Sequence, residues 1–393
     1  MNISDLKQRA IKNIDNARDE LIQLSTTIHA NPELAFKEFK SSALLCDALE
    51  KHGLPVERGI GGLETAFRAE VRGKRAGPTI AVLAEYDALP NLGHACGHNI
   101  IGTAAIGAGI ALQSLIGELP GRVLVIGTPA EEGGSGKIVL LKNGVFAGVD
   151  ASMLVHPAAR TMVTRPSLAT ERLTLEFFGK ASHAAAAPED GINALEALLA
   201  AFHNINALRL HLKADARIHG IITNGGSAIN IIPEYAAAKF SIRAATRAYV
   251  TEISRRVVQC AQAGALATGA ELRYTADDGL AEIIPNRAMG RAFAENWRAI
   301  GVEVYEPRPN ERMGSTDHGD VSHALPSLHP YIAIAPDGTA GHSIEMRQAA
   351  ISAAGHTGLL NAAKGLAMTT IDLLCDENLM QEVKREFSAT TQK

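Results

Sequence analysis

The stretch GHACGHN, residues 93–99, places Cys96 between His94 and His98. A thiol between two imidazoles is compatible with three arrangements: a nucleophile with its base, a metal site, or a buried cysteine beside histidines that do no chemistry. Free cysteines are often buried, so the third arrangement is about as common as a functional one for such a residue taken alone. The remainder of the chain has to distinguish the three.

Further polar residues follow three apolar segments that have the character of buried strands. These segments are PTIAVLAEYDALP with Asp87, GRVLVIGTPAEEGG with Glu131 and Glu132, and VDASMLVHP with His156. The turn that holds the thiol comes directly after the first segment. Because sites in open α/β sheets form beyond the carboxyl ends of strands, we expect these acidic, thiol and imidazole groups to meet at one edge.

A metal site accounts for more of these residues than the other two arrangements do. Thiolate, imidazole and carboxylate ligands together suit zinc, or manganese and cobalt where oxygen and nitrogen predominate. Of the adjacent carboxylates Glu131 and Glu132, one can bind metal while its neighbour holds a proton. A nucleophilic Cys96 would need a thiolate of low pKa, a base and an oxyanion site, and it would leave the glutamate pair without a role.

Composition is that of a globular protein with more than one hydrophobic core. The chain has 393 residues, a hydrophobic fraction of 46% and a net charge of -4, with no run of lysine or arginine. We therefore expect two domains and no nucleic-acid partner. No secretory signal and no bilayer-spanning run is found, so we expect no membrane partner. Four widely spaced cysteines predict free thiols in a reducing cytoplasm.

Apolar periodicity predicts two different kinds of layer. The first part alternates near-continuously apolar strands with helices, which indicates an α/β layer with a largely parallel sheet. From about Leu168 to Asp278 the order becomes β-α-β-β-α-β, and the strands alternate apolar and polar residues as strands with one solvent-exposed face do. This order indicates an α+β insertion. Helix and strand signals then return, and the segment 351–374 closes the pattern as a helix.

Several motifs occur together in one order along the chain. They are AEYDALPNLGHACGHNIIGTAAIGAG, TPAEEGGSGK, LVHP, GKASHAAAAPEDGINALEAL, NIIP and GTAGHSIEM. The set resembles the M20 family of metallopeptidases and amidohydrolases, in the branch with a Cys-Gly-His ligand turn. That branch includes N-acyl-amino-acid amidohydrolases, aminobenzoyl-glutamate hydrolases and dipeptidases. The motifs extend over nearly the whole chain and are specific for the family more than for a substrate.

The resemblance implies a fold and a domain arrangement. The catalytic domain is expected from residues 1–167 and 285–393, with a mostly parallel central sheet of the di-metal exopeptidase type. Residues 168–284 are expected to form an inserted ferredoxin-like α+β domain that acts as a lid and forms a homodimer, or part of a higher oligomer.

The resemblance also implies a set of site residues. The metal ligands would be Cys96, His98, Glu132, His156 and His342, which hold two divalent ions per subunit, zinc or manganese, with cobalt as a further candidate. The catalytic group would be Glu131 as general base, Asp87 as the acid that orients a ligand, and His183 as an oxyanion donor that reaches the site of the other subunit. The substrate would meet Asn230 and Arg243.

Other polar residues need separate interpretations. The loop GSTDHGD could present backbone N–H groups of Gly314 and Ser315 to a substrate anion, or it could be an ordinary turn. Glu85 stands where the wider family has a metal-binding histidine, so we do not count it as a ligand. Asn99 stands where many members of the branch have aspartate. The histidines that match no ligand position are expected to be surface or packing residues: His94, His318, His323 and His329.

These observations together predict an enzyme that hydrolyses an amide bond. The substrate would be a small N-acyl amino acid or a dipeptide, attacked by a metal-activated water with Glu131 as base. Three alternatives stay open: an aminopeptidase that acts on longer peptides, a non-catalytic binding protein stabilised by metal, and a cysteine hydrolase.

Overall fold

The computed structural model describes residues 2–309, 311 and 313–391 of the chain. The chain folds into two compact units. Unit 1 consists of Met1–Pro166, Ile283–Arg312 and Thr316–Lys393, and unit 2 consists of Ser167–Glu282 and Met313–Ser315. Each unit has a hydrophobic core of its own.

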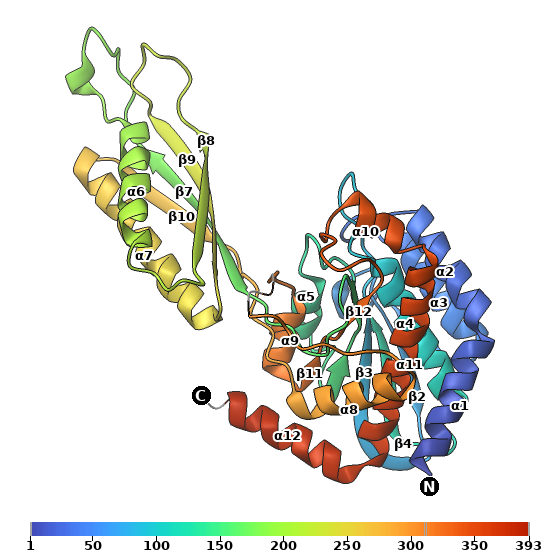
Figure 1. Ribbon diagram of the computed structural model, residues 1–393. Coiled ribbons are helices and arrows are strands. Elements are labelled where there is room, and N and C mark those ends of the chain that lie inside the picture. Colours follow the sequence, from blue (N-terminus) through green and yellow to red (C-terminus); the bar gives the residue numbers. More distant parts are fainter. Residues whose placement is uncertain (1, 310, 312, 392–393) are drawn as a thin grey trace. The chain divides into compact units, whose positions relative to one another are not determined.

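Unit 1 is built on a mixed sheet with strand order β1-β2-β4-β3-β5-β11 (Figure 1). The strands are β1 (Val56–Arg58), β2 (Phe67–Arg72), β4 (Pro120–Gly127), β3 (Arg75–Ala84), β5 (Ala151–Met153) and β11 (Ser327–Leu328). The pairings β4–β3, β3–β5 and β5–β11 are parallel, whereas β1–β2 and β2–β4 are antiparallel. A separate parallel pair joins β6 (His156–Ala158) to β12 (Tyr331–Ala333). The mostly parallel central sheet is therefore confirmed.

Helices cover both faces of this sheet. They are α1 (Ile3–Asn16), α2 (Arg18–Ala30), α3 (Phe39–Lys51), α4 (His98–Gln113), α5 (Gly136–Lys142), α8 (Arg287–Ala299), α9 (His318–Ala324), α10 (Ile344–Ala349), α11 (Ala353–Cys375) and α12 (Glu377–Thr391), with a short 3-10 turn at Ile60–Gly62. Alternation along β3 explains the layering. Ile80 and Val82 belong to the core shared with α4 and α11, whereas Ala81 and Leu83 belong to the core shared with α5 and α9.

Helix α4 is buried along almost all of its length, because it lies against the sheet on one side and against α1, α2 and α11 on the other. Its small residues permit this close packing: a Cβ on Gly109 would lie 2.7 Å from Val125 Cγ2. The first residue of the helix is His98, so a rigid buried element positions the candidate metal ligand. None of the described helices is long and apolar enough to cross a membrane.

Unit 2 has the predicted β-α-β-β-α-β order. Its elements are β7 (Ala169–Phe178), α6 (Ala194–Arg209), β8 (Arg217–Asn224), β9 (Tyr235–Ala244), α7 (Arg247–Thr268) and β10 (Glu271–Ala276). The four strands form an antiparallel sheet in the order β10-β7-β9-β8, and both helices cover one face (Figure 1). On β9, alternate residues such as Phe240 and Ile242 are buried under the helices, and Lys239, Ser241 and Arg243 lie on the other face.

Candidate metal centre

The expected metal ligands of unit 1 come from loops at the carboxyl ends of its strands. Asp87 lies three residues after the end of β3, and Glu131 and Glu132 follow the end of β4 at Gly127. His156 begins β6, shortly after β5 ends.

The turn that carries the thiol depends on a glycine. Gly97 has φ +76°, and a Cβ at this position would lie 2.8 Å from Pro157 Cγ. A residue with a side chain would therefore be strained by both its backbone and its neighbour. Gly97 therefore connects the turn that contains Cys96 to helix α4, whose first residue, His98, is buried.

Asp87 fixes the orientation of two neighbouring groups. Its Oδ1 is 3.0 Å from His98 Nδ1, and its Oδ2 accepts a hydrogen bond of 2.8 Å from the backbone N–H of Glu132. Burial alone would raise the pKa of Asp87, but His98 and these hydrogen bonds lower it below its ordinary value. With Nδ1 of His98 engaged, the nitrogen left to bind a cation is Nε2, as in carboxylate–histidine–metal arrangements.

Two groups of potential ligands share the thiol. Within each group the ligand atoms lie within 4.8 Å of one another: Cys96, His98 and His156 form the first group, and Cys96, Glu132 and His342 form the second. A third group contains His98, Glu131 and Glu132. Nδ1 of His156 is 2.6 Å from the carbonyl oxygen of Pro157, which leaves its Nε2 for a cation as well. A sulfur common to both groups places them next to each other, so each group could hold one of two adjacent cations.

The donor atoms fit divalent cations. His98 Nε2 and Glu132 Oε1 are buried and have no hydrogen-bond partner among the described residues, although they lie only 3.8 Å apart. Buried polar atoms are rarely left without a partner, and a cation would satisfy both. Burial raises the pKa of the Cys96 thiol, which is the opposite of what an activated nucleophile shows. The donor set of thiolate, imidazole and carboxylate suits zinc-type ions.

Glu131 lies near other carboxylates, among them Glu85 and Asp317. Burial is the largest cause that raises its pKa well above the ordinary value, and the charges of Glu85 and Asp317 raise it further. A carboxyl with such a pKa holds a proton readily. Its backbone is set by the preceding residue, because Ala130 has φ +63° and donates its N–H to Glu38 Oε1 at 2.9 Å.

A buried ion cluster lies beside these ligands and was not predicted from the sequence. Lys137 Nζ is 2.7 Å from Glu85 Oε1 and 2.7 Å from Asp317 Oδ1, and all three side chains are fully buried. The only signal in the sequence was a lysine at the start of the otherwise apolar segment GKIVLL, directly after a Gly-Ser-Gly turn. Such a lysine is usually assigned to the helix surface, so its burial was missed.

The remaining polar residues near the edge are packed in the interior. His94, His318 and His329 are buried, and none belongs to a ligand group found among the described residues. The ring of His329 lies 5.6 Å from that of His156, centroid to centroid, so it packs directly behind a candidate ligand. Asn99 Nδ2 donates to Ser25 Oγ at 2.9 Å, which ties the start of α4 to α2.

Unit 2 brings its expected substrate-binding residues together in two places. Arg243 Nη1 donates to Ser315 Oγ at 3.0 Å, and the carbonyl of Gly314 accepts from Leu168 N–H at 2.8 Å. At the other end of the sheet, the backbone N–H of Ala184 donates to the carbonyl of Asn230 at 3.0 Å, beside the exposed His183.

The imidazole of His183 is held in one tautomer by its own loop. Its Nδ1 accepts the backbone N–H groups of Ala185 and Ala186 at 3.2 and 3.1 Å. A nitrogen that accepts two hydrogen bonds carries no proton, so Nε2 carries it in the neutral ring. His183 therefore presents an N–H donor to the solvent.

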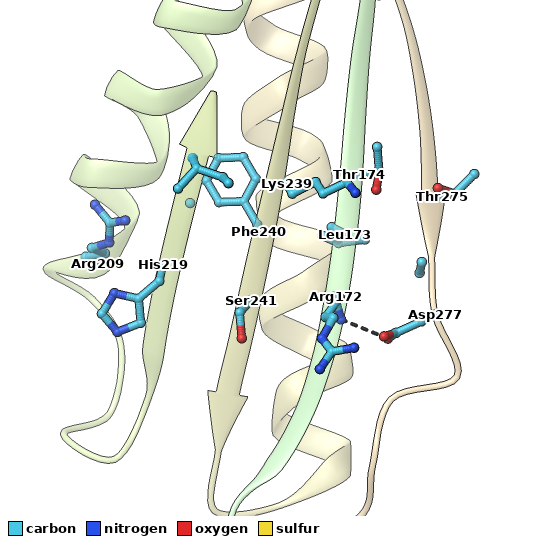
Figure 2. Close-up of a pocket in the computed structure, with 13 residues that line it drawn as sticks. Arg172, Leu173, Thr174, Arg209, His219, Lys239, Phe240, Ser241, Thr275 and Asp277 are labelled. Atoms are coloured by element: carbon cyan, nitrogen blue, oxygen red, sulfur yellow. Dashed lines mark hydrogen bonds between the residues drawn. The ribbon is translucent and has the colours of Figure 1, made fainter. Parts of the chain in front are cut away.

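The uncovered face of the unit 2 sheet contains an open groove of about 830 Å³ (Figure 2). Arg172, Lys239 and Ser241 point into it, and the backbone N–H of Arg172 donates to Asp277 Oδ1 at 2.9 Å. None of the site residues expected from the sequence lines this groove.

Comparisons with known proteins agree with this geometry. Residues 163–268 match the model of the peptidase dimerisation domain, M20_dimer. The chain is 39% identical to the Xaa-Arg dipeptidase of Mus musculus, over 99% of this chain and 93% of that protein. It is 32% identical to one of the subunits of the p-aminobenzoyl-glutamate hydrolase of Escherichia coli, over 96% of this chain and 94% of that protein.

Among solved structures, a dinuclear metal-binding peptidase of the M20 family from Bacillus subtilis superposes with a TM-score of 0.72. The two are 21% identical, and the superposition covers 92% of this chain and 99% of that one, so it shows a common fold. The identity to the dipeptidase over almost the full length shows more. The chain belongs to the M20 peptidase family and is a metal-dependent hydrolase of amide and peptide bonds.

Proposed function

We propose that this protein hydrolyses the amide bond of a dipeptide or a small N-acyl amino acid with two divalent ions, zinc or manganese, or cobalt in their place. The observation that carries the proposal is the pair of ligand groups that share Cys96. Glu131 belongs to neither of them and lies beside His98 and Glu132 in the third group. Relatives named as dipeptidase and as aminobenzoyl-glutamate hydrolase support this substrate class. A dipeptide that ends in arginine is the first candidate.

The chain supplies the proton transfers. Divalent ions at this edge would lower the pKa of a water molecule and polarise the scissile carbonyl. Glu131 takes a proton from the attacking water and passes it to the departing amine. Asp87 keeps Nδ1 of His98 engaged and so holds the ring in one orientation. His183 donates its Nε2–H to the developing oxyanion.

Arg243 and the loop at Gly314 and Ser315 would bind the substrate carboxylate. A guanidinium can grip a carboxylate through two parallel hydrogen bonds. The contact between Arg243 and Ser315 supports their action on one ligand group. Asn230 would meet the substrate together with its neighbour His183.

The spacing within unit 2 supports a homodimer in which His183 acts on the other subunit. His183 and Asn230 lie beyond the Tyr235 end of β9, whereas Arg243 lies near its opposite end. Eight residues of strand separate these ends, which is about 26 Å. A dipeptide spans only about 7 Å, so one subunit cannot present both sets to the same substrate.

The edge strand β8 is the surface that we propose for dimer contact. Ile221 and Ile222 on this strand are exposed, and Ile229 and Ile231 on the following loop are exposed as well. An unpaired strand edge with apolar side chains is a ready site for pairing with a second copy. A reducing cytoplasmic location is part of the proposal, and the four free cysteines are consistent with it.

One experiment tests the function directly. The protein is freed of metal and reloaded with zinc, manganese or cobalt, then assayed on dipeptides, N-acyl amino acids and longer peptides. Metal-dependent turnover of dipeptides or N-acyl amino acids supports the proposal. Preference for longer peptides would favour an aminopeptidase, and tight binding without turnover would favour a binding protein.

A cysteine hydrolase remains testable by alkylation. As a ligand, Cys96 should react slowly with iodoacetamide while metal is bound and rapidly after chelation. A nucleophile should instead react fastest in the active, metal-loaded protein.

A further inference from the structure

Three charged side chains lie buried beside the candidate ligands. They come from segments far apart in the sequence: Glu85 follows β3, Lys137 is the second residue of α5, and Asp317 precedes α9. Asp317 holds the lysine twice, because its Oδ1 accepts from Nζ at 2.7 Å and its Oδ2 accepts from the backbone N–H at 2.9 Å. The contact of Lys137 Nζ with Glu85 Oε1, also 2.7 Å, is an ion pair without hydrogen-bond alignment.

Such a cluster is expensive to bury. Removal of each ion from water costs several kcal/mol, and apolar residues of the same volume would often be no less stable. Burial would lower the pKa of Lys137, but the charges of Asp317 and Glu85 raise it above the ordinary value. The lysine therefore carries a positive charge in the folded protein. One of its two carboxylate neighbours, Glu85, lies next to the candidate metal ligands.

Glu85 is the neighbour that faces the metal edge. Its Oε2 lies 3.6 Å from His98 Nε2, the same nitrogen that would bind a cation. An ionised carboxylate at that distance would compete for the cation. Yet Glu85 belongs to none of the ligand groups found among the described residues, and its other oxygen is drawn to Lys137.

We propose that Lys137 is a positioning residue that holds Glu85 out of the ligand set of the bound cations. The ammonium engages the charge of Glu85, and Asp317 fixes the ammonium in place. The donor set is then confined to the two groups that share Cys96, and Glu131 keeps its proton-transfer role. This inference rests on the proposed metal-dependent function.

The first test uses Glu85→Gln, which removes the charge and leaves the pair of Lys137 and Asp317 intact. The metal-free protein is titrated with Co²⁺, and ligand-field absorption, affinity and stoichiometry are measured. Because Glu85 is held out of the ligand set, the absorption spectrum and the stoichiometry should equal those of the wild type, whereas the loss of a nearby negative charge lowers the affinity. A changed spectrum or a lost cobalt ion would show that Glu85 is a ligand and would overturn the proposal.

The second test releases Glu85. The double variant Lys137→Met/Asp317→Asn leaves its carboxylate without a cation, and the triple variant with Glu85→Gln added is the matched neutral control. The double variant should bind cobalt with weaker, shifted ligand-field bands, as a carboxylate joins the ligands, and with affinity changed about 10-fold or more. The triple variant should return to the wild-type spectrum.

Two outcomes of the second test contradict the proposal: a wild-type spectrum in the double variant, or equal changes in the double and the triple variant. If the double variant shows no cooperative thermal transition, Glu85→Gln decides alone by the criterion above. Dipeptide turnover is measured on the same wild-type preparation. A normal cobalt spectrum without turnover would reject the proposed hydrolysis and leave the role of Lys137 to be judged on the spectra.

Discussion

The candidate metal edge of unit 1 and the exposed loops that carry His183 and Asn230 in unit 2 are fixed to very different degrees. At the metal edge, Asp87, His98 and Lys137 are buried and held by several side-chain contacts each. In unit 2, His183 and Asn230 are exposed. Backbone N–H groups of the loop donate to His183 Nδ1, and the carbonyl of Asn230 accepts from Ala184 N–H. The donor geometry of unit 1 is therefore set by packed side chains, whereas His183 and Asn230 lie on exposed loops.

Replacement of the proposed base should have the largest effect on the organised edge. Glu131→Gln keeps the shape of the side chain but cannot accept the proton of the attacking water. We expect turnover to fall about 10² to 10⁴-fold while metal content, measured by mass spectrometry of the metal, stays normal. Metal content halved or lower would mean that Glu131 and Glu132 have exchanged roles.

The exposed residue of unit 2 should matter for turnover and not for metal. His183→Ala removes the proposed oxyanion donor, so we expect a loss of about 10² to 10³-fold with unchanged metal content. A similar loss from His203→Ala, a change in helix α6 of the same unit, would indicate a general disturbance of unit 2 instead.

Mixed dimers of the two variants test whether His183 acts across subunits. Refolding His183→Ala together with Glu131→Gln gives dimers in which one site has both an intact Glu131 and an intact His183 from the other chain. We expect activity near half that of the wild-type dimer, with mixed dimers verified by a mass tag. No recovery in verified mixed dimers would place His183 in its own subunit's site or outside any site.

A smaller effect should follow when the orientation of a ligand is loosened. Asp87→Asn removes the charge and one of the two oxygens that contact His98 Nδ1 and Glu132 N–H. We expect zinc affinity, measured by competition with a chelator, to fall about 10- to 100-fold. Asp150→Asn is the matched control, because Asp150 accepts from Thr79 N–H at the opposite edge of the sheet. Equal losses in the two variants would contradict a specific role for Asp87.

The smallest effect concerns stability and pH. Glu38 accepts the N–H groups of Phe36 and Ala130, and burial raises its pKa from 4.5 to about 6. As pH rises from about 4.5 to 6, the unfolded chain releases this proton first, so the folded state loses stability; the loss is then constant above 6. Glu38→Gln lacks this dependence.

The measurement compares the free energy of unfolding of wild type and Glu38→Gln between pH 4 and 8. The wild type should lose up to about 2 kcal/mol relative to the variant across this window, since one pKa unit corresponds to about 1.4 kcal/mol. A difference that does not change with pH would show that Glu38 is not titrating in the folded state.

The local pattern of the sequence determined the order of the elements and the kind of chemistry. Period-2 and period-3.6 apolar spacing predicted the strand–helix order of unit 1 and the β-α-β-β-α-β order of unit 2, because both periods are properties of neighbouring residues. The Cys-Gly-His turn and the glutamate pair indicated a metal edge for the same reason.

Only the tertiary structure decided how these residues combine. Lys137 and Asp317 are 180 positions apart, and no local period records their contact or the burial that makes it an ion pair in the interior. The sharing of Cys96 between two ligand groups likewise depends on where His156 and His342 lie in space. Charges that a sequence pattern assigns to the surface become buried partners only when packing removes water from around them, and that is settled by distant segments of the chain.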